Sequence, residues 1–388
     1  MSEKRRKLRV LFIPYWYPPR KGQNRVDGTF NREHALAAAI HDDVRVLVFR
    51  RNSKVSTVKM QIYNDENVPT YDISYPWTGR SPIHFARRRL LWMKSLRTAL
   101  RGWGRPDLFH FQDMSSFYGG VTAKLMGVPY VVSQHWTGFM KGLVKPCDLN
   151  RFHRSLKDAQ LVLAASLEAP EYLASYGIQA KVEWFPNTYD PSVFWPGGDD
   201  CRERRLLHVS EPTDQKRVPD IIQAFRRVVA DFPEASIRFV GDGDNRNRLE
   251  AMAAEILPDG SFDFTGFMDK VNVAEEMRNC AGFVFPSSAE TFGCVLMEAM
   301  ACGCPVLTTR VGGIPAVVRD GEGIFVEVGN IDAIAEGMKT LLSGDHSLPL
   351  QTIAEEVRNR FSRNVVGKML HSAYRRALGI SEDNHREQ

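Results

Sequence analysis

The chain has 388 residues, of which 43% are hydrophobic and 25% are charged, and its formal net charge is +5. This length can bury two hydrophobic cores, and the composition is ordinary for a folded globular protein. No apolar run reaches the roughly 18 residues needed to cross a bilayer, and the basic N-terminus has no small-residue cleavage site, so the sequence indicates neither a membrane span nor a signal peptide. The mild positive charge fits an anionic small ligand or an anionic membrane surface, and the sequence carries no nucleic-acid-binding signature.

The first predicted elements open a doubly wound α/β domain. A mostly apolar run at residues 8–13 predicts a buried parallel strand. A long loop over residues 15–28 follows, then a helix over residues 29–40 and a strand over residues 44–49. The loop after the first strand is where such sheets bind ligands. Three cations of this loop either face an anionic ligand or lie in solvent, namely Arg20, Lys21 and Arg25.

Residues 83–103 predict a basic amphipathic helix. Its apolar face carries Phe85, Trp92, Leu96, Ala99 and Trp103. Its opposite face carries Arg87, Lys94, Arg97 and Arg101. One interpretation is a helix that packs on the sheet and exposes its cations to solvent. The other is a surface that attracts anionic lipid headgroups and brings the protein to a membrane.

Strands at residues 107–111, 129–132 and 161–164 continue this domain, and a helix follows near residues 170–176. His135 comes directly after the second of these strands. Because the carboxyl ends of parallel strands open onto ligand sites, this position favours a role for His135 in binding.

The α/β pattern restarts after a proline-containing polar segment at residues 184–196, which is typical of a linker. The next predicted elements are strands at residues 206–209, 237–240 and 262–264 and a helix at residues 218–231. They predict a second doubly wound parallel-sheet domain, and we expect the two Rossmann-like domains to face one cleft.

The sequence contains no cofactor or metal signature. The six cysteines are irregularly spaced, and Cys302 and Cys304 have no nearby histidine or second pair to complete a metal site. The sequence GDGD at residues 241–244 contains an aspartate pair, but it follows a strand as a tight turn and lacks the third glycine of a dinucleotide fingerprint. We therefore expect no metal, and free thiols in a reducing cytoplasm.

The most informative stretch covers residues 285–309. A strand at its start leads to a loop with Glu290, and a helix begins after Gly293 and carries Glu298. The first N–H groups of this helix favour phosphate. With a rise of ~1.5 Å per residue, the two carboxylates lie on the order of 10 Å apart. An acid–nucleophile pair of a retaining glycosidase lies ~5–5.5 Å apart, so we interpret these glutamates as binding hydroxyls at the two ends of one long ligand.

The segment ETFGCVLME, followed by AMACGCPVLTTRVGG, resembles the family-4 retaining glycosyltransferases of the GT-B fold. The resemblance implies an acceptor-binding domain at residues 1–195, to which a last helix at about residues 361–388 crosses back. It implies a nucleotide-sugar-binding domain at residues 196–360. It further implies that a hexose moves from a nucleotide sugar to an acceptor hydroxyl with retention, without a cofactor or metal. A UDP-sugar is favoured by its frequency in the family.

The resemblance also assigns roles to single residues. It places Glu290 and His135 on the transferred sugar, Glu298 on the ribose, Lys216 on the donor diphosphate and Gly28 on the acceptor side. The remaining residues implied on the donor side are Arg217, Gly266, Phe267, Phe292, Gly293, Cys294 and Val295.

One family feature is missing. Residues 210–213 are Ser, Glu, Pro and Thr, in the region where the family usually has a phosphate-binding arginine. Either Arg217 supplies the second positive charge, or a loop cation such as Arg20 or Lys21 does.

Three other functions remain open. A GT-B nucleotide-sugar epimerase or hydrolase would share the fold, a dinucleotide oxidoreductase would need the missing glycine fingerprint, and a non-catalytic two-lobed binding protein would need an export signal. The expected partners are a nucleotide sugar and a glycan, lipid-linked or small-molecule acceptor, without nucleic acid. We expect a cytoplasmic protein, with peripheral contact to an anionic membrane as the second interpretation of residues 83–103.

Overall fold

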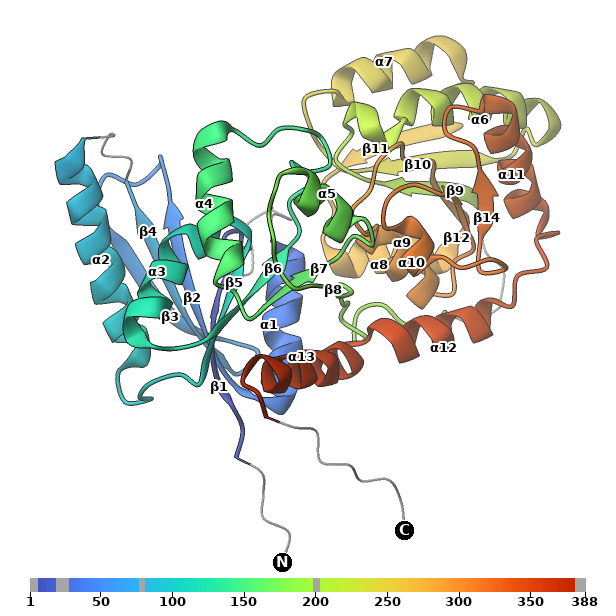
Figure 1. Cartoon of the computed structure of the whole chain (residues 1–388). Coiled ribbons are helices and arrows are strands. Elements are labelled where there is room, and N and C mark those ends of the chain that lie inside the picture. Colours follow the sequence, from blue (N-terminus) through green and yellow to red (C-terminus); the bar gives the residue numbers. More distant parts are fainter. Residues whose placement is uncertain (1–5, 19–27, 77–80, 198–202, 381–388) are drawn as a thin grey trace, which may run out of the picture. The chain divides into compact units, whose positions relative to one another are not determined.

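The computed structural model describes residues 6–18, 28–76, 81–197 and 203–380. The chain forms two compact units, which we call unit 1 (Met1–Thr188 and Arg363–Gln388) and unit 2 (Tyr189–Ser362). Each unit is built on one sheet with helices on its faces (Figure 1). The predicted fold class, two doubly wound domains with parallel sheets, is confirmed. No helix in the described ranges is long and apolar enough to cross a membrane.

The sheet of unit 1 is parallel except for its first strand. Its order is β3 (Lys59–Asp65), β4 (Val68–Tyr75), β2 (Asp43–Arg51), β1 (Arg9–Ile13), β5 (Leu108–Gln112), β6 (Tyr130–Gln134), β7 (Leu161–Ala164) and β8 (Val182–Trp184). Only β3 runs antiparallel, to β4. This hairpin was not predicted, because its turn residues Glu66 and Asn67 take positive φ values of 48° and 71° without the Asn-Gly or Asp-Gly signal that marks such turns.

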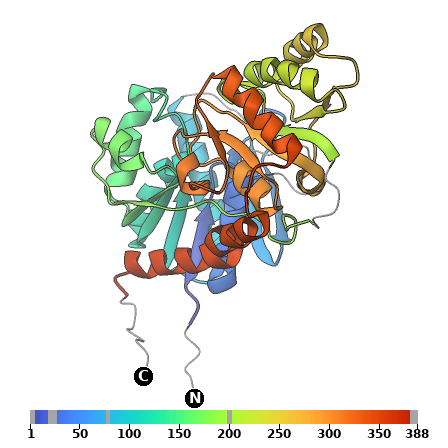
Figure 2. The same ribbon diagram turned by 90° about the vertical axis from the view of Figure 1, so that its right-hand side faces the viewer.

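Two helix layers cover this sheet. The helices of unit 1 are α1 (Thr29–His41), α2 (Pro82–Leu100), α3 (Ser116–Met126), α4 (Pro146–Lys157), α5 (Ala169–Ser175) and α13 (Arg363–Ala377). On one face of the sheet, a core cluster joins β1 and β2 to α1 and α13. On the opposite face of the same sheet, a second cluster joins the strands to α2, α3 and α4. Figure 2 shows α13 beside α1, where Arg363 donates to Glu33 at 2.6 Å.

The predicted apolar face of α2 is correct in its second half and wrong at its start. Trp92, Leu96 and Ala99 are buried against the sheet. Phe85 is 47% exposed, because the first turns of α2 are not covered by the sheet. The helix ends at Leu100, so Trp103 is buried from the following turn.

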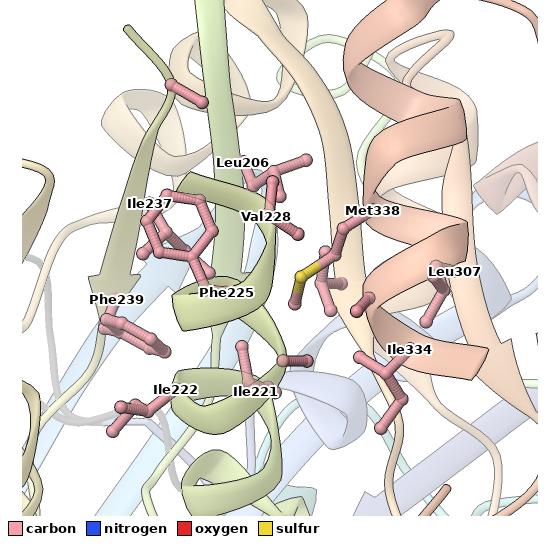
Figure 3. Packing of buried hydrophobic residues seen from close by; sticks show 14 of the residues in the cluster. Leu206, Ile221, Ile222, Phe225, Val228, Ile237, Phe239, Leu307, Ile334 and Met338 are labelled. Atoms are coloured by element: carbon pink, nitrogen blue, oxygen red, sulfur yellow. The ribbon is translucent and has the colours of Figure 1, made fainter. Parts of the chain in front are cut away.

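Unit 2 has an all-parallel sheet with a core on both faces. Its order is β11 (Phe262–Gly266), β10 (Ser236–Val240), β9 (Glu203–Val209), β12 (Cys280–Phe285), β13 (Val306–Thr309) and β14 (Ile324–Val326). Its helices are α6 (Val218–Asp231), α7 (Arg246–Ile256), α8 (Lys270–Asn279), α9 (Cys294–Ala301), α10 (Ile314–Val317), α11 (Ile331–Ser343) and α12 (Leu350–Phe361). Figure 3 shows Phe225 of α6 and Met338 of α11 among the buried side chains of one core cluster, which also includes Leu206 of β9 and Ile237 of β10.

Candidate active site

Unit 2 carries the predicted donor-side residues at the point where its strand order reverses. β9 and β12 are neighbours, and the chain continues outward from each in opposite directions. In open α/β sheets, ligands bind outside the carboxyl ends of the strands at such a switch point. The loop after β9 carries Lys216, and the loop after β12 carries Glu290. The N–H group of Ser288 donates to the carbonyl of Gln215 at 2.8 Å and joins the two loops.

Lys216 and Glu290 form an ion pair at this point. The Ser287 hydroxyl donates to the same carboxylate at 3.2 Å, and the Lys216 ammonium lies 4.7 Å from the ring centroid of Phe285. The side chains of Lys216 and Glu290 are 21% and 13% exposed, so solvent screens their charges only weakly. The structure thus brings together a cation and a carboxylate that the sequence analysis placed separately, and their chemistry suits a phosphate and a sugar hydroxyl.

The start of α9 lies in the same loop. Gly293 precedes the helix with a φ of 86°, in the left-handed region that glycine adopts without strain. The side chain of Phe292 is buried in the core, so only its main chain is available to a ligand. Cys294 and Val295 are partly exposed in the first turn. At this end of a helix the dipole and the N–H groups favour an anion.

Glu298 also forms an ion pair. Its carboxylate accepts a hydrogen bond from the Lys270 ammonium at 3.1 Å, and the two side chains are 14% and 32% exposed. The same ammonium lies 5.6 Å from the ring centroid of Phe194. Lys270 was missed in the sequence analysis, because it is the first residue of α8 and only the packing of α8 beside α9 brings it to Glu298.

The loop before α6 holds Arg217 in an unusual conformation. Its φ is 54°, and its Nε donates to Asp220 at 2.7 Å. The side chain of Arg217 is 39% exposed. Arg217 therefore remains a candidate for the second cation, although its nearest charged partner is a carboxylate of its own helix.

Arg246 supports the predicted donor-binding turn at Gly266, and the sequence analysis missed it. Its Nη2 donates to the carbonyl of Phe264 at 2.8 Å, and a Cβ atom on Gly266 would lie 2.9 Å from its Nη1. Its Nε is buried without a hydrogen-bond partner among the described residues. Phe267, which follows the turn, is partly exposed.

Gly28 in unit 1 has a structural reason to be glycine. Its φ is 79°, and a Cβ atom would lie 2.4 Å from the carbonyl carbon of Trp16. The glycine therefore allows the start of α1 to lie against the loop after β1. Its predicted place beside the acceptor remains a prediction. Arg20, Lys21 and Arg25 lie outside the described residues.

His135 lies beyond the carboxyl end of β6, as predicted. Both ring nitrogens are buried without a hydrogen-bond partner among the described residues. The ring lies 4.7 Å from that of Phe30 and 5.3 Å from that of His34, between centroids. Burial lowers the pKa of His135 well below its usual value, so the ring is neutral near pH 7. A neutral imidazole with an unused donor and an unused acceptor can bind a sugar hydroxyl.

Asp113 fixes the backbone that carries His135. One oxygen of its carboxylate accepts hydrogen bonds from the N–H groups of His135 at 2.8 Å and of Trp136 at 3.0 Å. Asp113 takes a φ of 49°, and its other oxygen is buried without a partner in the described ranges. Burial raises the pKa of this carboxyl from 3.8 to about 7. No local pattern indicated this contact, since Asp113 and His135 follow different strands.

The substitution Asp113→Asn tests this buried carboxyl. Because its pKa is raised to about 7 on folding, the folded protein keeps a proton that the unfolded chain releases. The resulting stability is complete below the unfolded pKa and is lost as the pH rises through the folded pKa. We expect the free energy of unfolding, wild type minus variant, to fall between about pH 4 and pH 7 by up to about 1.4 kcal/mol per pH unit. Denaturant titrations at several pH values measure it, and a flat or rising difference would contradict the assignment.

Metal ligands do not gather in the described part of the chain. Within residues 6–18, 28–76, 81–197 and 203–380, no three side chains of His, Cys, Asp or Glu are placed to hold a metal ion together. Cys280 and Cys304 lie with their Sγ atoms 3.4 Å apart in the core of unit 2.

Two family models match the chain, one in each unit. The model of the glycosyl transferases group 1 matches residues 194–365. The model of the glycosyl transferase 4-like domain matches residues 33–188. Together they cover every strand of the two sheets except β1, and the site residues described above except Gly28.

Individual relatives agree with the family models. The chain is 37% identical over 144 residues to N-acetyl-alpha-D-glucosaminyl L-malate synthase of Bacillus anthracis, a match that covers 37% of each protein. It is 29% identical over 262 residues to D-inositol 3-phosphate glycosyltransferase of Acidothermus cellulolyticus, across 59% of the chain and 58% of that enzyme. The matches thus span between about a third and three fifths of these relatives.

Solved structures share the fold. The Anabaena protein HepE in complex with UDP-glucose superposes with a TM-score of 0.73 at 16% identity, over 94% of the chain and 99% of HepE. At this identity, the likeness establishes the fold, which is that of the GT-B glycosyltransferases.

Proposed function

The chain belongs to the group 1 glycosyltransferases, and from this membership we propose that it transfers a hexose from a nucleoside diphosphate sugar to a hydroxyl group of an acceptor. UDP is the favoured nucleotide, and the anomeric configuration is retained. The acceptor is a glycan, a lipid-linked molecule or a small molecule, since the two relatives named above are named for different acceptors.

The Lys216–Glu290 ion pair is the observation that carries this proposal. It joins the loops after β9 and β12 at the switch point of the unit 2 sheet, next to the start of α9. An ammonium, a carboxylate and a helix start at one sheet edge suit a ligand that has both a diphosphate and sugar hydroxyls. The UDP-glucose complex of the structurally similar HepE supports the same ligand class.

In the proposed reaction the protein acts mainly by positioning and electrostatics. Lys216, with Arg217 and the first N–H groups of α9, stabilises the negative charge that grows on the departing diphosphate. Glu290 and His135 hold the hydroxyls of the transferred sugar, and Glu298 holds the ribose. The proton of the acceptor hydroxyl passes to the leaving diphosphate. This scheme assigns charge neutralisation to side chains and backbone, without a metal ion.

A panel of nucleotide sugars tests the ligand class by thermal shift. The panel contains UDP-glucose, UDP-N-acetylglucosamine, GDP-mannose, ADP-glucose and NAD. We expect one nucleotide sugar to stabilise the protein, by about 2.7 kcal/mol at a concentration of 100 times its Kd, and NAD to leave it unchanged. Stabilisation by NAD alone would contradict the proposal and favour an oxidoreductase.

The products separate a transferase from the alternatives. A transferase releases nucleotide faster when its acceptor is present, and the product keeps the anomeric configuration of the donor by NMR. An epimerase or hydrolase releases nucleotide without an acceptor, and a non-catalytic binding protein releases none.

We also propose that unit 1 contacts an anionic membrane surface through α2 and α3. Large apolar side chains are exposed on both helices, namely Ile83, Phe85, Leu90, Tyr118, Val121 and Leu125. α2 contains no acidic residue and exposes Arg87, Arg89, Lys94 and Arg97. Exposed apolar side chains beside exposed positive charge suit the interface of an anionic bilayer.

Vesicle flotation checks this contact with a matched pair of variants. We expect the protein to float with vesicles that contain phosphatidylglycerol and not with neutral vesicles, because the cations need anionic headgroups. The double substitution Leu90→Ser and Leu125→Ser should abolish flotation, since it removes two apolar side chains that are 70% and 74% exposed. Ile62→Ser on β3, where the side chain is 59% exposed, is the control and should float as the wild type does. Equal flotation with anionic and neutral vesicles would count against the proposal.

A further inference from the structure

A cluster of tyrosines and one arginine lies where the strand order of unit 1 reverses. β1 is flanked by β2 and β5, so the switch point lies between β1 and β5. Tyr15 follows β1, and Tyr118 lies in α3, which follows β5. Tyr75 ends β4, and Arg88 reaches the cluster from α2. We propose that this cluster, which we call the Arg88 site, binds a phosphate or carboxylate group of the acceptor; the proposal rests on the transferase function above.

Arg88 is held between two aromatic rings. Its Cζ atom lies 4.8 Å from the ring centroid of Phe85 and 4.6 Å from that of Tyr118. Two aromatic rings at these distances restrict the guanidinium, whose N–H groups lie in the plane of the group. The planar fork of an arginine matches the oxygens of a phosphate or carboxylate. The two rings therefore preorganise Arg88 as an anion-binding group.

The hydrogen-bonding capacity of Arg88 is not used up within the protein. A side-chain hydrogen bond joins it to Tyr75. Its Nη2 is buried and has no hydrogen-bond partner among the residues that the structure describes. An unsatisfied buried donor on a charged group is destabilising, so a site that keeps one is poised for a ligand that accepts a hydrogen bond from it.

The tyrosines add neutral donors to the site. Burial raises the pKa values of Tyr15 and Tyr75 above 10.0, so both hydroxyls keep their protons and can donate to an anion. Tyr15 and Tyr118 are 43% and 44% exposed, so a ligand can reach them from solvent.

The charges around the site favour an anion. Arg51 lowers the pKa of Tyr15, and Asp148 and Asp113 raise it, so all three charges lie near this hydroxyl. The Asp148 carboxylate already accepts a hydrogen bond from Arg151 at 3.0 Å. The pKa of Asp113 is raised to about 7, so its negative charge is incomplete near neutral pH. Arg88 and Arg51 thus face little uncompensated negative charge.

The acceptor's anionic group has three possible sources, which share this chemistry. It is a phosphate on a soluble acceptor, a carboxylate on a soluble acceptor, or a phosphate in the headgroup of a lipid-linked acceptor. The last source is consistent with the exposed apolar residues of the same two helices.

Binding of simple probes to the full chain tests the Arg88 site. Saturating UDP first fills the proposed donor site, so that phosphate probes cannot bind there. The probes are glycerol 3-phosphate, succinate, uncharged glycerol and vesicles containing phosphatidylglycerol. Kd values for the soluble probes come from ligand-observed NMR, and those for vesicles come from flotation.

Substitutions of single arginines distinguish a specific contact at Arg88 from a general effect of positive charge. We expect Arg88→Gln to raise the Kd of the anionic probe that binds best by about 10- to 100-fold. This is the effect expected for the loss of a charge-assisted hydrogen bond. Arg89→Gln removes an equal charge from an exposed position of α2 and should change the binding of the soluble probes less than about twofold. For vesicles, where Arg89 belongs to the proposed membrane surface, Arg154→Gln at an exposed position of α4 is the control. Arg88→Lys keeps the charge without the planar fork and should bind between Arg88→Gln and the control. If Arg88→Gln fails to fold by thermal melting, Arg88→Lys carries the comparison with Arg89→Gln.

The binding data support or overturn the Arg88 site as follows. If the binding of glycerol 3-phosphate, succinate or vesicles depends on Arg88, the site is supported, and the probe that binds identifies the source of the anion. Anionic probes that bind no tighter than glycerol, or equal losses in Arg88→Gln and in the control variant for that probe, overturn it. UDP binding distinguishes the two proposals: if UDP fails to bind, the transferase proposal fails, whereas UDP binding without an effect of Arg88 removes only this inference.

Discussion

Replacing Lys216 with alanine should lower kcat by about 10²- to 10³-fold, the loss seen when one preorganised donor to a developing negative charge is removed. In the structure the side chain of Lys216 is 21% exposed, and its ammonium pairs with Glu290 and lies over the ring of Phe285. It is therefore fixed before the reaction begins, and it stabilises the leaving diphosphate most when the charge on that group is largest. Because the gain is concentrated in the transition state, kcat should fall more than the affinity for UDP.

The control for this substitution is another lysine of unit 2. Lys339 on α11 lies 2.7 Å from Asp231 and 2.9 Å from Glu336, in an exposed ion-pair cluster. Lys339→Ala should leave kcat within about twofold, since exposed pairs contribute little. Steady-state kinetics with the best donor of the panel, together with thermal melting of both variants, give the comparison. Equal turnover in the Lys216→Ala variant and the wild type would remove Lys216 from the mechanism.

Replacing Glu298 with glutamine should weaken UDP binding by about 10- to 100-fold, because a charge-assisted hydrogen bond to the ribose contributes about 1.5–3 kcal/mol. The carboxylate is held at 3.1 Å by Lys270, and its side chain is 14% exposed. Loss of the charge also removes the ion pair between Glu298 and Lys270, which adds to the effect.

A nucleotide without ribose hydroxyls tests the predicted contact between these hydroxyls and the Glu298 carboxylate. For the wild type, 2′,3′-dideoxy-UDP should bind about 10- to 100-fold more weakly than UDP. For Glu298→Gln, the two nucleotides should bind almost equally, since the partner of the hydroxyls is already removed. Calorimetric titration of both proteins with both nucleotides completes the cycle. Additive losses would show that Glu298 acts on another part of the ligand.

The local pattern of the sequence was enough to predict most strands and the strand–loop–helix segment that carries Glu290 and Glu298. The strand at β12, the turn at Gly293 and the helix that carries Glu298 lie within one short segment, so residue types alone predict their order and spacing. β7 and α6 were predicted to the residue, because each is a regular apolar pattern with a clear start and end.

Groups that meet only through packing were not predictable. Lys270 reaches Glu298 from another helix, and Asp113 reaches the N–H group of His135 from another strand. The ring stacking of Arg88 depends on the approach of α3 to α2. No local spacing in the sequence reports such contacts. The same holds for the fit of Gly28 against Trp16.

A crystal structure of the full chain with UDP-glucose would test the donor site most directly. We expect the diphosphate to contact Lys216 and the first N–H groups of α9, and the ribose hydroxyls to lie within hydrogen-bond distance of the Glu298 carboxylate. A nucleotide bound away from the carboxyl ends of β9 and β12, with Lys216 still paired only to Glu290, would contradict the proposed site.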